Sequence, residues 1–171
     1  MPEHTLVDLF VYGTLREGEC NDLAVAAATH SLPAPIALGR GALPGTLVDF
    51  GAWPGMLAAQ DVGVSSAAAA GMVRGEVYRI DVRLLPVVDA IEGYDASAPQ
   101  RPSCFVRRVA AVAVVDGVRP CQFYPVDPAF AVGKPPIAGG DWVAYRRARD
   151  SQGMAARTLP DGASPSQTRR P

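Results

Sequence analysis

The chain has 171 residues, 49% of them hydrophobic, and a formal net charge of −1 at neutral pH. This length and apolar content suit one domain with a substantial core, and the scattered basic residues exclude the basic surface of a nucleic-acid-binding protein. We expect no signal peptide and no membrane-spanning segment. Three widely spaced cysteines, Cys20, Cys104 and Cys121, argue against a disulfide framework or a zinc site. The default expectation is a soluble cytoplasmic protein.

The stretch at residues 9–16 predicts a buried strand that breaks at Gly13-Thr14. A strand that stops on glycine leaves backbone N–H groups open to a ligand, because no Cβ stands in the way. Such groups can hold a carboxylate or stabilise a developing oxyanion. An ordinary first strand closed by a turn is the alternative explanation of the same residues.

A short helix is predicted over residues 23–28, with Asn21 or Asp22 as its N-cap. The positive end of its dipole would then lie near the glycine loop. Short strands are predicted around residues 36–38 and over residues 45–50.

The segment Trp53-Pro54-Gly55-Met56 predicts a turn that carries two large apolar side chains. A tryptophan in this position usually fills a core, although Trp53 could instead line a pocket wall. The alanine-rich residues 63–71 predict a loop insertion or, at most, a poorly specified helix.

Residues 73–80 predict a strand in which Gly75 indicates a bulge or a close backbone approach. Asp81 can end this strand and open a helix. That helix is expected to begin near Leu84, because Pro86 is tolerated only in a first turn.

Gly93 is suited to end this helix in a left-handed conformation, which places Glu92 in the last helical turn. The helix dipole is negative there, and the neighbouring Ile91 and Tyr94 are largely apolar. Glu92 is therefore a candidate for the raised pKa that general acid–base chemistry requires. A solvated glutamate at a helix end is the alternative.

A hairpin is predicted from a strand at residues 105–115, through Asp116-Gly117, into residues 118–126. Pro120 in its second arm indicates an edge position or a bulge. Residues 143–149 could form a short strand or helix, packing Trp142 inward.

The polar composition from residue 151 onward predicts a disordered tail, so the domain is expected to span residues 1–150. Strands outnumber helices in it, which predicts a mixed α+β domain on a curled, barrel-like sheet.

Five segments resemble, in order and approximate spacing, the signatures of the gamma-glutamylcyclotransferase-like family, which includes gamma-glutamylamine cyclotransferase-like proteins. They are FVYGTLR at residues 10–16, WPG at 53–55, VRGEVY at 73–78, DAIEGY at 89–94 and GDW at 140–142. The resemblance covers roughly residues 6–145. It implies a small mixed α/β fold around a closed, barrel-like sheet with a few short helices.

Active members of that family split a γ-glutamyl amide into 5-oxoproline and a free amine or amino acid. The resemblance therefore implies a small-molecule γ-glutamyl substrate and Glu92 as the catalytic acid and base. The substrate's own α-amine attacks its γ-carbonyl, so neither a metal nor a cofactor is required. The implied substrate-binding residues are Tyr12, Gly13, Thr14, Leu15, Arg16 and Tyr124.

One departure from the family pattern concerns the residues after the catalytic glutamate. Members often carry Tyr-x-Arg where this chain reads Phe105-Val106-Arg107. The missing hydroxyl implies altered specificity, weak activity or a substitute such as Tyr124. The alternatives are therefore a binding module of the same fold that has lost catalysis and, less favoured, a thiol-dependent enzyme using Cys104 or Cys20.

Overall fold

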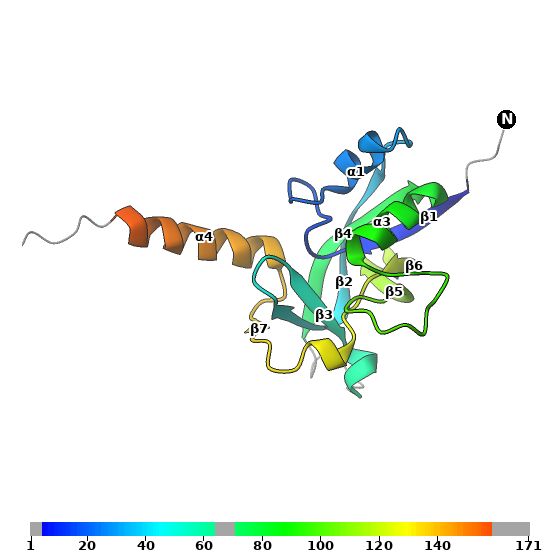
Figure 1. Cartoon of the computed structure of the whole chain (residues 1–171). Coiled ribbons are helices and arrows are strands. Elements are labelled where there is room, and N and C mark those ends of the chain that lie inside the picture. Colours follow the sequence, from blue (N-terminus) through cyan, green and yellow to red (C-terminus); the bar gives the residue numbers. More distant parts are fainter. Residues whose placement is uncertain (1–4, 64–70, 159–171) are drawn as a thin grey trace, which may run out of the picture.

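The computed structural model describes residues 5–63 and 71–158, and a closed five-stranded barrel forms its centre (Figure 1). The strands follow the order β2-β4-β1-β6-β5, and β5 pairs back onto β2 to close the barrel. Their bounds are β1 (Leu6–Val11), β2 (Ile36–Asp49), β4 (Met72–Asp81), β5 (Arg108–Val114) and β6 (Gly117–Phe123). The mixed α+β, barrel-like fold predicted from the sequence is confirmed.

Short strands and helices surround this barrel. β3 (Pro54–Ala58) and β7 (Pro136–Ile137) pair with the second half of β2. The helices are α1 (Leu23–Thr29), α3 (Leu85–Glu92) and α4 (Trp142–Thr158), with 3₁₀ turns η1 (Ala59–Val62), η2 (Val82–Leu84) and η3 (Pro128–Phe130). No helix in the described part of the chain is long and apolar enough to cross a membrane.

β1 belongs to two apolar clusters, because successive side chains of a strand point to opposite faces. Leu9 and Val11 belong to a cluster that also contains residues of α1 and α3. Phe10 and the following Tyr12 belong to a second cluster, with side chains of β2, β4, β5 and β6 and with Trp142. The same strand thus joins the helix-covered face to the barrel interior.

The local signals around α1 and α3 are confirmed. Asp22, rather than Asn21, caps α1 by accepting from the N–H groups of Ala24 and Val25. Asp81 ends β4 and opens the turn η2, and α3 carries its proline in the first turn. Gly93 ends α3 in the left-handed region, at φ 70°.

β2 corrects the prediction of two separate short strands. It is one strand of 14 residues, because the residues between the two predicted pieces pair with β4. The register shifts between Ala37 and Gly39, where φ of Gly39 is +109° and suits glycine. The predicted turn at residues 53–56 is also wrong, since β3 begins at Pro54 and pairs with β2.

The predicted hairpin is confirmed, although its arms are shorter than expected. Val114 pairs with Gly117, so the turn residues are Val115 and Asp116. Phe105 lies outside β5 and joins Val126 through an isolated bridge. Pro120 lies outside the pairing of β6 with β1, which is formed at Gln122, so its missing N–H costs no bond there.

Residues 143–149, predicted as a short strand or a helix, belong to the helix α4, which continues to Thr158. The helix therefore continues past residue 150, where the polar composition predicted a disordered tail. An i,i+4 ion pair between Arg146 and Asp150 supports the helix across that point. Residues 159–171, and residues 64–70 of the alanine-rich segment, lie outside the described residues.

Candidate active site

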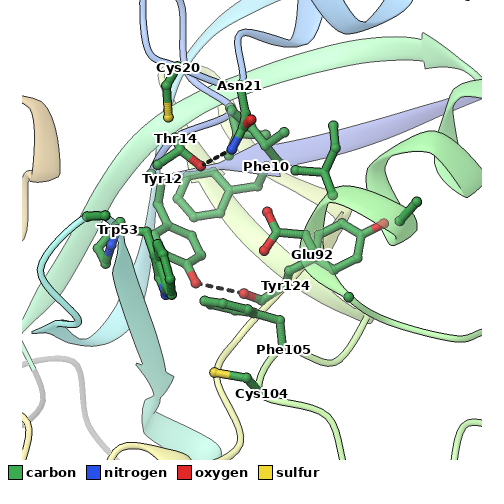
Figure 2. Close-up of a pocket in the computed structure, with 18 residues that line it drawn as sticks. Phe10, Tyr12, Thr14, Cys20, Asn21, Trp53, Glu92, Cys104, Phe105 and Tyr124 are labelled. Atoms are coloured by element: carbon green, nitrogen blue, oxygen red, sulfur yellow. Dashed lines mark hydrogen bonds between the residues drawn. The ribbon is translucent and has the colours of Figure 1, made fainter.

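A cavity of about 570 Å³ opens beside the end of β1. Its lining comes from residues 10–15, 20–21, 52–54, 90–93 and 104–105, together with Tyr124. Mouths of small barrels are common ligand sites because side chains fill the rest of the interior. The end of β1 and the end of α3 thus meet at one concave surface (Figure 2).

Hydrogen bonds that its carbonyl groups accept hold the loop after β1 in place. Arg16 N–H donates to the Gly13 carbonyl at 3.2 Å, and Asn21 N–H donates to the Thr14 carbonyl at 3.0 Å. The N–H groups of Gly13, Thr14 and Leu15 have no acceptor among the residues that the structure describes. Gly13, Thr14 and Leu15 line the cavity, so these N–H groups are candidate donors to a ligand there.

Gly13 is required by packing rather than by an unusual backbone angle. A Cβ at this position would lie 2.8 Å from Cγ of Pro54. The loop and the start of β3 can lie this close only because the side chain is absent.

The ring of Tyr12 lines the cavity, but its hydroxyl is already hydrogen-bonded to other protein groups. The hydroxyl donates to the Tyr124 carbonyl at 2.7 Å and accepts from Met56 N–H at 3.1 Å. Burial, with the nearby Glu92, raises the pKa of this phenol well above its ordinary value. Tyr12 thus ties the loop to β3 and to the end of β6.

Glu92 is the last residue of α3, and its carboxylate points into the cavity (Figure 2). It is only partly exposed and makes no hydrogen bond to any described residue of the chain, so no protein group compensates the water that it loses. Burial raises the pKa of Glu92 to about 7. At neutral pH this carboxyl group can therefore both accept and donate a proton.

Asp89, which sequence reasoning did not single out, organises one wall of the site. Its carboxylate accepts from the Tyr124 hydroxyl at 2.6 Å and from Arg107 at 2.8 Å. Tyr124 lines the cavity, but this bond engages its hydroxyl. Asp89 lies three residues before Glu92 on α3, and that helical spacing is the signal that could have found it.

Arg16 is the predicted substrate-binding residue that the structure places outside the cavity lining. Its side chain is buried, with the residue 4% exposed, and pairs with Glu76 at 3.0 Å and Asp141 at 2.9 Å. Those partners lie on β4 and just before α4. Arg16 anchors the loop from behind instead of facing a ligand.

Comparison with known families identifies the chain. Its sequence matches the family described as gamma-glutamyl cyclotransferase, AIG2-like, over residues 9–144. The chain belongs to this family. A search of curated proteins found no significant match.

Solved structures share the fold of this AIG2-like family member. An AIG2-like protein from Mus musculus is 22% identical, with a TM-score of 0.61, over 97% of this chain and 100% of that one. YkqA from Bacillus subtilis is 21% identical with a TM-score of 0.59, over 86% of this chain. This chain spans 43% of the YkqA chain. An uncharacterised protein, PH0828 from Pyrococcus horikoshii, is 18% identical with a TM-score of 0.51, over 85% of this chain and 97% of that one.

The thiol alternative gains no support from the cavity of this AIG2-like protein. Cys104 and Cys20 both line it, but burial and the charge of Glu92 raise the pKa of the Cys104 thiol. An activated cysteine needs the opposite shift. His30 caps the end of α1 and is not part of the lining.

The structure places Trp53 in the pocket wall rather than in the core. It is 47% exposed and belongs to the cavity lining, whereas Trp142 fills the core with no exposed surface. Among the described residues, no three His, Cys, Asp or Glu side chains are arranged to hold a metal ion.

Proposed function

We propose that this AIG2-like protein cleaves a γ-glutamyl amide into 5-oxoproline and a free amine or amino acid. One observation carries the proposal. A carboxyl group with no hydrogen-bond partner among the described residues, and with a pKa raised to about 7, shares a cavity with backbone donors that lack acceptors.

The substrate supplies its own nucleophile. Its α-amine attacks the γ-carbonyl carbon, so the new C–N bond closes a five-membered ring and the old amide C–N bond breaks. Because the amine is tethered to the carbonyl, attack avoids most of the entropy cost of a bimolecular step. The protein must then manage protons and charge.

Glu92 would carry the protons. At neutral pH the substrate amine is an ammonium ion, and the ionised Glu92 carboxylate would remove one proton before attack. The protonated carboxyl group would then donate to the departing nitrogen and return to its starting state. The second proton, which the ring nitrogen still carries after attack, would pass to the freed amine or to solvent. A pKa near the working pH suits both transfers.

The loop after β1 would stabilise the negative charge. The N–H groups of Gly13, Thr14 and Leu15 are available to a substrate carboxylate or to the oxyanion that forms at the γ-carbonyl. Held donors need no reorganisation during the reaction, which makes them more effective than water.

The direct test is to incubate the protein with a panel of γ-glutamyl amines and γ-glutamyl amino acids and to measure 5-oxoproline. We expect turnover of at least one compound, with an acid limb in the pH profile near pH 7 where Glu92 gains its proton. Glu92→Gln should lower kcat by about 10²-fold or more. No product from any compound would refute the proposed reaction, and full activity in this variant would refute the role given to Glu92.

A catalytically inactive binding module is the second candidate, and Phe105 favours it. This side chain lines the cavity and has no hydroxyl to offer a substrate. A thermal-shift screen against small carboxylates separates the candidates, because a binder would show saturable stabilisation without product.

A further inference from the structure

α4 lies outside the cavity, yet its first half contacts two of the loops that line it. Among the described residues, α4 contributes no side chain to the cavity lining. Its first turns lie against the barrel and the rest extends away from it (Figure 1). One of the two loops is the loop after β1. The other is the β2–β3 loop, residues 50–53, which supplies Ala52 and Trp53 to the lining. Contacts with α4 can therefore shape the cavity without touching a ligand.

Arg146 of α4 holds the loop after β1 through Glu19. Its Nε donates to one oxygen of the Glu19 carboxylate at 2.9 Å, and its Nη2 donates to the other at 2.6 Å. A two-point contact of this kind fixes orientation as well as distance. Glu19 is 9% exposed, and the next two residues, Cys20 and Asn21, line the cavity. Trp142 Nε1 also donates to the Glu19 carboxylate, at 3.3 Å.

A short chain of backbone hydrogen bonds connects Glu19 to the start of the same loop. Glu19 N–H donates to the Arg16 carbonyl at 3.1 Å, and Arg16 N–H donates to the Gly13 carbonyl. A displacement of Glu19 would therefore be transmitted to Gly13, Thr14 and Leu15, whose N–H groups are the candidate donors to a ligand.

Arg149, which is also on α4, holds the β2–β3 loop. Its Nη1 donates to the Gly51 carbonyl at 2.7 Å and lies 3.8 Å from the Asp49 carboxylate at the end of β2. Its guanidinium lies over the ring of Trp142, 5.4 Å from the ring centre, which restricts its position. Gly51 has a φ of +92° and directly precedes the lining residues 52–53. Arg149 thus fixes the backbone that carries Trp53.

These contacts distinguish two arginines of α4 from a third. Arg146 and Arg149 are three residues apart, so they lie on the same side of the helix. Arg147 lies between them, is exposed, and makes no hydrogen bond or ion pair with a described residue. Trp142, which has no exposed surface, attaches the start of α4 to the barrel cluster independently of all three. The contacts of Arg146 and Arg149 therefore act on the loops rather than on the attachment of the helix.

We propose that Arg146 and Arg149 are positioning residues of the site. Arg146 orders the loop after β1, and Arg149 orders the β2–β3 loop. Neither side chain touches a ligand, because each acts through backbone that lines the cavity. The ordering of the two loops does not depend on what the cavity binds, whereas its effect on catalysis rests on the function proposed above.

Amide hydrogen exchange, resolved residue by residue by NMR, tests each loop separately. The reporters are hydrogen-bonded N–H groups, those of Arg16 and Asn21 in the first loop and those of Phe50 and Gly51 in the second. We expect Arg146→Ala to accelerate exchange of the first pair at least about tenfold and to leave the second pair unchanged. Arg149→Ala should do the reverse. The amides of the barrel strands should keep their rates in both variants.

Arg147→Ala is the matched control, because it removes the same side chain from the same helix without breaking a contact to either loop. It should leave both pairs of reporters at their original rates. Unchanged rates in both loops of Arg146→Ala and Arg149→Ala would overturn the inference. Equal acceleration throughout the chain would overturn it too, because it would show a general structural role.

A double-mutant cycle tests whether Arg146 acts through Glu19. We expect Glu19→Gln to accelerate the same two amides as Arg146→Ala, and the double variant to differ from Arg146→Ala by no more than about twofold. Accelerations that multiply in the double variant would overturn the proposed route. If Arg146→Ala does not fold, Arg146→Lys replaces it. Lysine keeps the charge but not the two-point contact, so the same amides should be accelerated by a smaller factor.

The effect on catalysis is measured with the γ-glutamyl compound that the wild type converts best. Arg146→Ala should lower kcat at least about tenfold and change KM less, because the loop donors act on charge that develops in the transition state. Arg146→Lys should recover part of kcat. The acid limb near pH 7 should stay in place, since Glu92 lies on α3 and not on either loop.

The two proposals fail in different ways. If no γ-glutamyl compound gives 5-oxoproline, the proposed function fails, and the exchange rates still decide whether the arginines order the loops. An unchanged kcat in a variant whose first loop exchanges faster would overturn the link between loop order and catalysis and leave the proposed function intact.

Discussion

Glu92 combines two properties that oppose each other at the scale of a single residue. Burial without a hydrogen-bond partner among the described residues raises its pKa from 4.5 to about 7, which suits proton transfer. The same burial penalises the charged form in the folded state. The group that we propose for catalysis is thus also a source of instability at neutral and alkaline pH.

This cost makes the stability of the protein depend on pH through Glu92. Between pH 4.5 and 7 the folded chain holds a proton that the unfolded chain releases, so the free energy of unfolding falls as pH rises. We expect Glu92→Gln to gain roughly 3 kcal/mol over the wild type between pH 4 and pH 8. Urea denaturation at both pH values measures it, and a constant difference would contradict the assigned pKa.

Tyr12 supports the site by joining three segments through one hydroxyl. We expect Tyr12→Phe to lower the free energy of unfolding by about 1–3 kcal/mol, because Met56 N–H and the Tyr124 carbonyl lose a buried partner. Tyr94→Phe is the matched control, since the Tyr94 hydroxyl has no hydrogen bond within the described chain. Denaturant titrations compare the two, and similar losses would mean that the hydroxyl of Tyr12 is not special.

At the scale of elements, β1 and β4 pack closely enough to require a glycine. An added Cβ at Gly75 would lie 2.2 Å from the Val11 carbonyl oxygen and 2.8 Å from the Phe10 ring. The close backbone approach predicted from the sequence is therefore confirmed. It lies at the end of β1 that leads directly into the loop after β1, which lines the cavity.

We expect Gly75→Ala to lower the free energy of unfolding by at least about 2 kcal/mol, because backbone atoms cannot yield as a flexible side chain can. Gly153→Ala in α4 is the control, since its added Cβ meets nothing within 4 Å. That change should be neutral or should stabilise by roughly 0.5–1 kcal/mol. Chemical denaturation measures both, and a harmless Gly75→Ala would show that the strands can separate.

At the scale of the whole molecule, the two apolar clusters share β1, which cannot leave one without disturbing the other. We therefore expect one cooperative unfolding transition. In a Trp53→Phe background, tryptophan fluorescence should follow Trp142, which is fully buried in the barrel cluster, and far-UV circular dichroism should follow the helices as well. Separate midpoints for the two signals would show that the barrel and the helical layer unfold independently.

Pairing between distant strands also explains why some elements were predicted incorrectly from the sequence. The pieces of β2 join only because β4 supplies partners for the residues between them. The hydrogen bonds of a strand go to another part of the chain, so a local sequence pattern shows a strand less completely than it shows a helix.

The sequence by itself determined the features that depend on neighbouring residues. It predicted the end of β1 to within two residues, since the strand stops at Val11 rather than at Gly13. It also predicted the end of α3 at Gly93 with Glu92 in the last turn, and the hairpin near Asp116. A glycine or a cap acts on the backbone beside it, so its effect can be inferred from the local sequence.

Only the tertiary structure decided which side chains face the cavity. Arg16 follows the loop directly, yet it pairs with Glu76 and Asp141, 60 and 125 residues further along the chain. These two partners hold the Arg16 side chain away from the cavity lining. In a similar way, Asp89 accepts a hydrogen bond from the hydroxyl of Tyr124. The direction of a polar side chain depends on the charges that folding brings to it, and no local pattern contains them.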